Sequence, residues 1–131
     1  MVLRTKITYN NGKTWQDLVP PTLDANGQRL CDYHPDKCTL NLFGATTWVQ
    51  TDDEKTFGNF YSVKHAIGMI IGTGRVGSHL NEDENAEINT YFSRDGGLSW
   101  DEIIEGSTIY EYGDHGGLLV LAWNNVHTRL V

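Results

Sequence analysis

A short motif that occurs twice constrains the fold of this chain more than any other feature. Both copies, at 8–15 and 93–100, follow the template Ser/Thr-x-Asp/Asn-x-Gly-x-Thr/Ser-Trp. The Asp or Asn can accept backbone N–H bonds across a turn, and the Gly can take the positive φ of a tight hairpin. The Trp would begin the outgoing strand and pack against the sheet. The residues of the template are Thr8, Asn10, Gly12, Trp15, Ser93, Asp95, Gly97 and Trp100.

The rest of the chain also has the pattern of β-structure. Short segments rich in Val, Ile, Thr and aromatic residues are bounded by Gly, Asn, Asp or Pro. These predicted strands are 3–9, 14–18, 39–43, 46–51, 68–73, 88–93, 99–104, 118–123 and 126–131. No stretch of a dozen residues has a helical period, so we expect no helix longer than two turns. The template is the Asp-box, and its two copies predict hairpin turns at 10–13 and 95–98. Because propeller blades repeat about every 40–50 residues, two copies in a β-rich chain also predict an all-β propeller.

Composition excludes several classes of partner. The 131 residues include 39% hydrophobic side chains, which is enough for a core, and carry a formal charge of −7. Nucleic acids and anionic membranes both need clustered cations, so we expect contact with neither. No apolar run approaches the roughly 20 residues of a membrane span, and the start has no apolar signal core. The chain is therefore either cytosolic or part of a longer precursor, and a strand that begins without a lead-in favours the second interpretation.

Two cysteines, Cys31 and Cys38, lie in the turn-prone segment CDYHPDKC. A zinc site needs four ligands and no second cluster occurs later in the chain, while the common redox motif has two intervening residues. A disulfide is therefore favoured, with free thiols as the alternative, and it would indicate an oxidising compartment.

Four acidic residues near the second box could be read as a glycosidase acid pair: Asp95, Asp101, Glu102 and Glu105. Asp95 is explained by the turn, and the others come after Trp100 on an outer strand. A sialidase would need clustered arginines, and the five arginines here lack the accompanying motif. We therefore expect a binding scaffold rather than an enzyme, with no catalytic, cofactor-binding or metal-binding residue.

Two further patterns have simpler structural interpretations. The segment 72–77 matches Gly-x-Gly-x-x-Gly, but the next residues, Ser-His-Leu-Asn-Glu-Asp, cannot open a helix, which argues against a dinucleotide site. The histidines could act as pH switches, but we expect structural or exposed roles. They are His34, His65, His79, His115 and His127.

The order of segments adds a family resemblance. A Pro-rich connection and the two cysteines come after the first box. Then come Cys38-Thr-Leu-Asn-Leu-Phe, Ile67-Gly-Met-Ile-Ile-Gly-Thr-Gly-Arg-Val-Gly, the second box, and Ile109-Tyr-Glu-Tyr-Gly-Asp-His-Gly-Gly-Leu-Leu-Val. Over nearly its whole length the chain resembles the late blades of the sortilin-family luminal domain, especially fungal receptors that sort vacuolar hydrolases. Thr8 and Asn10 replace the usual Ser and Asp of the box, and both keep the needed acceptor.

This resemblance implies a ten-bladed propeller, accompanied in the family by cysteine-rich modules, a membrane span and a cytoplasmic tail. The chain would be a partial β-propeller of about three blades: the end of one blade at 1–20, a connection with the cysteine pair and the next blade at 21–112, and the start of a following blade at 113–131. Because a blade buries both faces against its neighbours, we expect the isolated chain to be marginal and to self-associate.

The implied function is that of a luminal ligand-binding segment of a type I membrane sorting receptor, which carries soluble hydrolases from Golgi to endosome or vacuole. Its partners would be the remainder of its own propeller and, through the full receptor, hydrolase cargo. No ligand-contacting residue is carried over, because nothing here matches the known peptide site of the family. The alternative is a fragment of an Asp-box glycoside hydrolase with a sialidase-like propeller.

Overall fold

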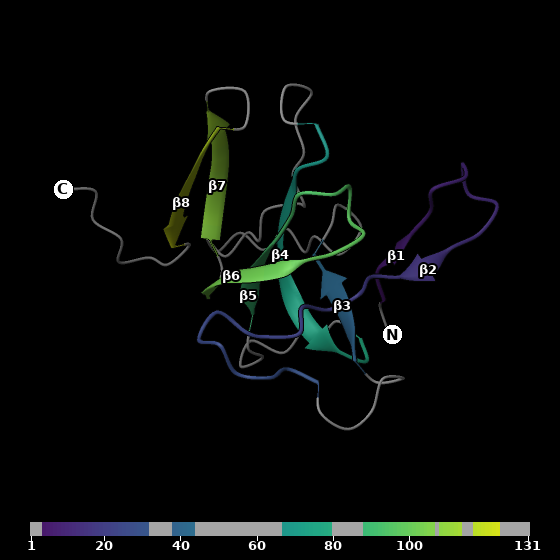
Figure 1. Cartoon of the computed structure of the whole chain (residues 1–131), viewed down its shortest axis with the longest axis horizontal. Coiled ribbons are helices and arrows are strands. Elements are labelled where there is room, and N and C mark those ends of the chain that lie inside the picture. Colours follow the sequence, from purple (N-terminus) through teal and green to yellow (C-terminus); the bar gives the residue numbers. More distant parts are fainter. Residues whose placement is uncertain are drawn as a thin grey trace, which may run out of the picture.

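A computed structural model describes residues 4–31, 38–43, 67–79, 88–106, 108–113 and 117–123. Within these ranges all regular structure is antiparallel β-sheet, with no helix, as expected (Figure 1). The strands are β1 (Lys6–Ile7), β2 (Gln16–Asp17), β3 (Thr39–Leu42), β4 (Ile70–Gly77), β5 (Asn89–Ser93), β6 (Asp101–Glu105), β7 (Thr108–Gly113) and β8 (Leu118–Trp123). The predicted strands at 46–51 and 126–131 lie outside the described residues.

A four-stranded meander, β3-β4-β5-β6, forms the centre of the described structure. Each strand pairs antiparallel with the next one along the chain. This is the strand arrangement of a propeller blade. The hairpins β1–β2 and β7–β8 lie on opposite sides of the meander (Figure 1). The fold is a partial β-propeller.

The core lies where the first hairpin meets the meander. Its buried members are Leu18, Leu40, Leu42, Tyr91 and Trp100, with Ile7, Ile70 and Val76 packed against them. β3 and β5 are buried along their whole lengths, whereas β6 has both buried and exposed residues. The first hairpin thus supplies part of the apolar surface that covers the blade.

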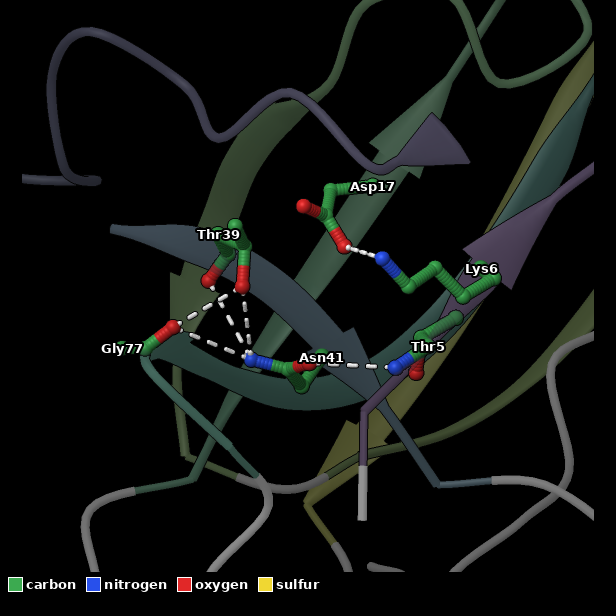
Figure 2. A network of polar contacts seen from close by, with 6 residues as sticks. All are labelled: Thr5, Lys6, Asp17, Thr39, Asn41 and Gly77. Atoms are coloured by element: carbon green, nitrogen blue, oxygen red, sulfur yellow. Dashed lines mark hydrogen bonds and ion pairs between the residues drawn. The ribbon is translucent and has the colours of Figure 1, made fainter. Parts of the chain in front are cut away.

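Asn41, fully buried on β3, fastens the first hairpin to the blade. Its side-chain Oδ1 accepts a bond from the Thr5 backbone N–H (3.1 Å), and its Nδ2 donates to the carbonyls of Thr39 (3.3 Å) and Gly77 (3.1 Å), as Figure 2 shows. The Thr5 hydroxyl accepts from the Leu42 N–H at 2.9 Å. Because a buried amide left unpaired costs about 1–3 kcal/mol, this network fixes the position of β1 relative to β3.

β4 is longer than predicted, because three glycines within it weaken the sequence pattern of a strand. The segment 72–77, which matches Gly-x-Gly-x-x-Gly, lies inside this strand rather than after one. A Cβ atom added at Gly74 would lie 1.9 Å from the carbonyl oxygen of Asn41 on β3. That glycine is needed where two backbones approach closely, and not to bind a phosphate.

β7 was not among the predicted strands, although it pairs with β8 along its whole length, from Thr108↔Trp123 to Gly113↔Leu118. In the predicted division, this segment belongs to the unit at 21–112 up to residue 112. The sheet after the meander begins at Thr108, whereas the next blade was predicted to begin at 113.

Candidate functional site

The first Asp-box closes the β1–β2 hairpin through a set of side-chain bonds to the turn. The Thr8 hydroxyl accepts from the Gly12 N–H (2.9 Å), and the Asn10 Oδ1 accepts from the Thr14 N–H (2.9 Å). Asn10 Nδ2 donates to the Thr14 hydroxyl at 2.7 Å. The Trp15 indole N–H donates to the carbonyl of Gly12, whose φ is 86°. Asn11, with a φ of 59°, also has the left-handed conformation that is unfavourable for residues other than glycine, and these side-chain bonds help to hold the turn in it.

The second box, between β5 and β6, repeats these bonds. The Ser93 hydroxyl accepts from the Gly97 N–H and the Asp95 Oδ1 accepts from the Ser99 N–H, both at 2.9 Å. The Trp100 indole N–H donates to the carbonyl of Gly97, whose φ is 93°. One bond is reversed in direction, because the Ser99 hydroxyl donates to Asp95 where Asn10 donates to Thr14. The turn residues, 11–12 and 96–97, fall within the predicted ranges.

The repeat extends beyond the eight-residue template. The residue two positions before each box has a side-chain donor, and the residue two positions after the box has a carboxylate. These two residues are cross-strand partners. In the first hairpin Lys6 Nζ contacts Asp17 Oδ1 at 2.6 Å, and in the second the Tyr91 hydroxyl donates to Glu102 Oε1 at 2.9 Å. This pair was not predicted from the sequence. Alignment of the two boxes with longer flanks would have revealed the shared carboxylate two residues after each Trp.

The boxes differ in electrostatics. Hydrogen bonds from the Ser99 hydroxyl, the Ser99 N–H and the Ser93 hydroxyl lower the pKa of Asp95 to about 2. Asn10 occupies the same position in the first box and carries no charge. Only the second turn therefore holds an anion.

The boxes also differ in burial. Trp100 is 5% exposed and belongs to the core, whereas Trp15 is 60% exposed. The expectation that both rings pack against the blade is right for Trp100 and wrong for Trp15. The hydrogen bonds that the two turns share do not require burial of the ring, so the template alone could not distinguish the two.

The first hairpin lies directly against the second turn. The Tyr9 hydroxyl donates to the carbonyl of Gly96 at 3.2 Å. Burial, and then the nearby charge of Asp95, raise the pKa of Tyr9. A Cβ atom added at Gly97 would lie 2.8 Å from Cδ1 of Ile7. Two boxes far apart in the sequence are thus in contact through one apolar side chain and one phenol.

Three of the four acidic residues considered as a catalytic pair, Asp95, Glu102 and Glu105, have structural partners. Glu102 is buried, and it accepts bonds from Asn89 Nδ2 (2.9 Å) and from the backbone N–H of Ala25 (2.8 Å), besides the bond from Tyr91. Glu105 accepts from Asn26 Nδ2. Both carboxylates hold the 24–29 connection onto β6. Glu102 does lie on an outer strand, since β6 is at the edge of the meander, but the 24–29 connection covers it.

Cys31 and Cys38 form a disulfide, with Cα atoms 6.1 Å apart, and this confirms the predicted pairing. Of the five histidines only His79 is described, with Nδ1 2.8 Å from the Ser78 hydroxyl oxygen. The other four, His34, His65, His115 and His127, lie outside the described residues. No group of three or more potential metal ligands occurs in the described ranges. The same ranges contain no helix long and apolar enough to cross a membrane.

Comparison with known proteins places the whole chain in one family. The family model Sortilin-Vps10, described as sortilin, neurotensin receptor 3, matches residues 1–131. A Saccharomyces cerevisiae protein named uncharacterized membrane glycoprotein YNR065C is 42% identical over 128 residues, which is 96% of this chain and 11% of that protein. The vacuolar protein sorting/targeting protein 10 of Kluyveromyces lactis is 40% identical over 131 residues, and that of Komagataella phaffii is 39% identical over 123 residues.

These matches cover 98% and 91% of this chain and 8% of each of the two sorting proteins. The chain thus spans about a tenth of the length of the curated relatives it matches. With the Asp-box hairpins, the antiparallel meander and a match along its full length, the chain belongs to the Sortilin-Vps10 family.

Proposed function

We propose that this chain is a segment of the luminal, ligand-binding propeller of a sorting receptor that carries soluble hydrolases from the Golgi to the endosome or vacuole. The observation that carries the proposal is the family match along the whole chain, with relatives named for vacuolar protein sorting. The disulfide between Cys31 and Cys38 supports a luminal position, because such bonds persist in oxidising compartments.

The geometry of the site favours a scaffold over an enzyme. The Asp95 carboxylate accepts three bonds inside its own turn. The Glu102 carboxylate also accepts three, one from the Ala25 backbone N–H of the connection and two from side chains of β5. A glycosidase would need two carboxyls directed at a sugar across a cleft. Three of the four acidic residues on which the glycoside hydrolase alternative depended thus have structural partners, which supports a scaffold.

The sheets suggest how the segment divides into blades. The hairpin β1–β2 is the end of one blade, the meander β3–β6 is a complete blade, and β7–β8 opens the next. On this division the third unit begins near Thr108 rather than at 113. The first partner of the segment is then the remainder of its own propeller, and cargo binds through the full receptor.

A chimeric receptor tests this function. The matching segment of the Kluyveromyces lactis sorting protein is replaced by this chain, and soluble vacuolar hydrolases are assayed inside and outside cells that lack their own receptor. We expect the chimera to retain the hydrolases as the parent receptor does. Secretion at the level of receptor-deficient cells, from a chimera that is made and folded, would contradict the proposal. Hydrolysis of a fluorogenic sialoside by the purified chain would favour the enzymatic alternative.

A further inference from the structure

The chain contains two Asn-Gly pairs, Asn11-Gly12 in the first Asp-box and Asn26-Gly27 in the 24–29 connection, and both are exposed. Asparagine is a thermolabile residue. It is most labile before glycine, because the glycine nitrogen has no Cβ beside it to hinder attack on the asparagine side chain. Each pair is therefore a candidate for spontaneous deamidation, but only one of them joins two parts of the fold.

The 24–29 connection is a tight turn held by Asp24. The backbone carbonyl of Asp24 accepts from the Gly27 N–H at 3.1 Å, and its Oδ1 accepts from the N–H groups of Asn26 (2.9 Å) and Gln28 (2.8 Å). A Cβ atom added at Gly27 would have nothing within 4 Å, so water reaches this part of the turn. These bonds use the backbone of Asn26 and leave its side-chain amide to bind another element.

The side chain of Asn26 helps to fasten this connection to β6. Its Nδ2 donates to Glu105 Oε1, and the neighbouring Ala25 N–H donates to Glu102 Oε2 at 2.8 Å. Both acceptors are carboxylates, so this part of β6 binds donors and repels a negative charge. Among the described residues, no such bond joins the side chain of Asn11 to another element.

We infer that Asn26 is a self-modification site, guarded by Glu105, and that its deamidation releases the 24–29 connection from β6 irreversibly. The deprotonated Gly27 nitrogen attacks Cγ of Asn26. A bond from this nitrogen to Cγ forms, the Cγ–Nδ2 bond breaks, and Nδ2 leaves as ammonia with the proton that the Gly27 nitrogen gave up. Water then opens the cyclic imide, to aspartate by cleavage at Cγ or to isoaspartate by cleavage at the backbone carbonyl carbon. The reaction consumes water and releases ammonia, and it needs no oxidant or reductant.

Glu105 slows the first step while the connection is in place. The amide that has to turn towards Gly27 is bonded to Glu105, and the Gly27 N–H that has to lose its proton is bonded to Asp24. Both bonds must open before the ring can close, so the reaction proceeds when the connection lifts from β6. Deamidation of Asn26 therefore records this opening.

The product cannot restore the contact. A carboxylate at position 26 has no N–H to donate to Glu105, and it places a second negative charge beside that residue. Isoaspartate also adds a carbon to the backbone between the two N–H groups that bind Asp24. Either product leaves the connection off β6 and uncovers the buried Glu102.

Deamidation rates in the chimeric receptor test the guarding role of Glu105. The peptides that contain Asn11 and Asn26 are followed by mass spectrometry during incubation at mildly alkaline pH. Glu105→Ala should speed the conversion of Asn26 at least about fivefold, since a bond to a charged acceptor is lost at an exposed site, and should leave Asn11 unchanged. Asp101→Ala removes the exposed carboxylate at the other end of β6 and is the matched control. An Asn26 rate that ignores Glu105→Ala, or responds equally to Asp101→Ala, would overturn the inference.

The product itself is imitated by Asn26→Asp. In the chimeric receptor this substitution should speed hydrogen exchange in the peptide 22–30 at least about tenfold, because the contact with Glu105 is lost and replaced by repulsion. Asn11→Asp makes the same change in the other Asn-Gly pair and should leave the exchange of this peptide as it is in the wild type. Exchange that Asn26→Asp does not alter would show that the connection stays on β6 without the amide, and the inference would be wrong.

Discussion

The two Asp-box turns form the same hydrogen bonds in opposite surroundings. In each turn, a hydroxyl oxygen and an amide or carboxylate oxygen accept bonds from backbone N–H groups. In each, a glycine has positive φ, and its carbonyl accepts a bond from the indole N–H of the tryptophan. Yet the Trp15 ring is exposed and the Trp100 ring is buried. The motif therefore specifies a turn by local chemistry alone, and a neighbouring hairpin decides whether the turn becomes part of a core.

The tryptophans provide the largest expected contrast. Trp100→Ala removes a buried ring from the core and should cost about 3–5 kcal/mol in the free energy of unfolding. Trp15→Ala removes an exposed ring with one indole bond, and should cost about 1 kcal/mol. Chemical denaturation of the 131-residue chain measures both. Equal costs would show that the Trp15 ring is covered in the isolated chain.

The glycines of the turns give a smaller contrast. Both have positive φ, so Gly12→Ala and Gly97→Ala should each cost about 1–2 kcal/mol through backbone strain. Gly97→Ala should cost more, because its Cβ must displace the end of Ile7. The additional cost should disappear in an Ile7→Ala background, and thermal melts of the single and double variants would show it. An additional cost that persists there would locate the strain elsewhere.

Local patterns predicted the turns, most strands and the disulfide, because residues adjacent in sequence determine each of them. The longer β4 was not predicted, since Gly74 is explained only by the backbone of Asn41, far away in the sequence. The burial of Glu102 depends likewise on Ala25. Composition and periodicity do not reveal contacts between residues that are far apart in the sequence. The environment of a residue was therefore harder to predict than its local conformation.

The aspartate of the second turn should make only that turn sensitive to acid. Its pKa is about 2 in the folded chain against about 3.9 when unfolded, so its stabilising contribution is present above about pH 4 and is lost as the pH falls from there to about 2. Asp95→Asn should flatten this part of the stability profile. The amide can still donate to the Ser99 hydroxyl, as Asn10 donates to Thr14.

The reciprocal variant is the control for this acid sensitivity. Asn10→Asp should add a second acid-sensitive contribution, because the Thr14 N–H and hydroxyl would then bind a carboxylate. Unfolding free energies measured from about pH 2 to about pH 7 would show both changes. A wild-type profile that Asp95→Asn leaves unchanged would mean that other carboxylates account for the acid sensitivity.

The smallest expected effect concerns the bond between the two hairpins. Tyr9→Phe removes the hydroxyl that donates to the Gly96 carbonyl and should cost about 0.5–1 kcal/mol in the free energy of unfolding, since the bond is exposed.

The raised pKa of Tyr9 means that the contribution of the neutral phenol is present below about pH 10 and is lost as the pH rises through the folded pKa. A difference titration of phenolate absorbance between the wild type and Tyr9→Phe isolates this group. In Asp95→Asn the Tyr9 midpoint should fall but stay above its ordinary value, because burial is the larger cause and the charge the smaller. A midpoint that does not respond to Asp95→Asn would show that the two turns are not in electrostatic contact.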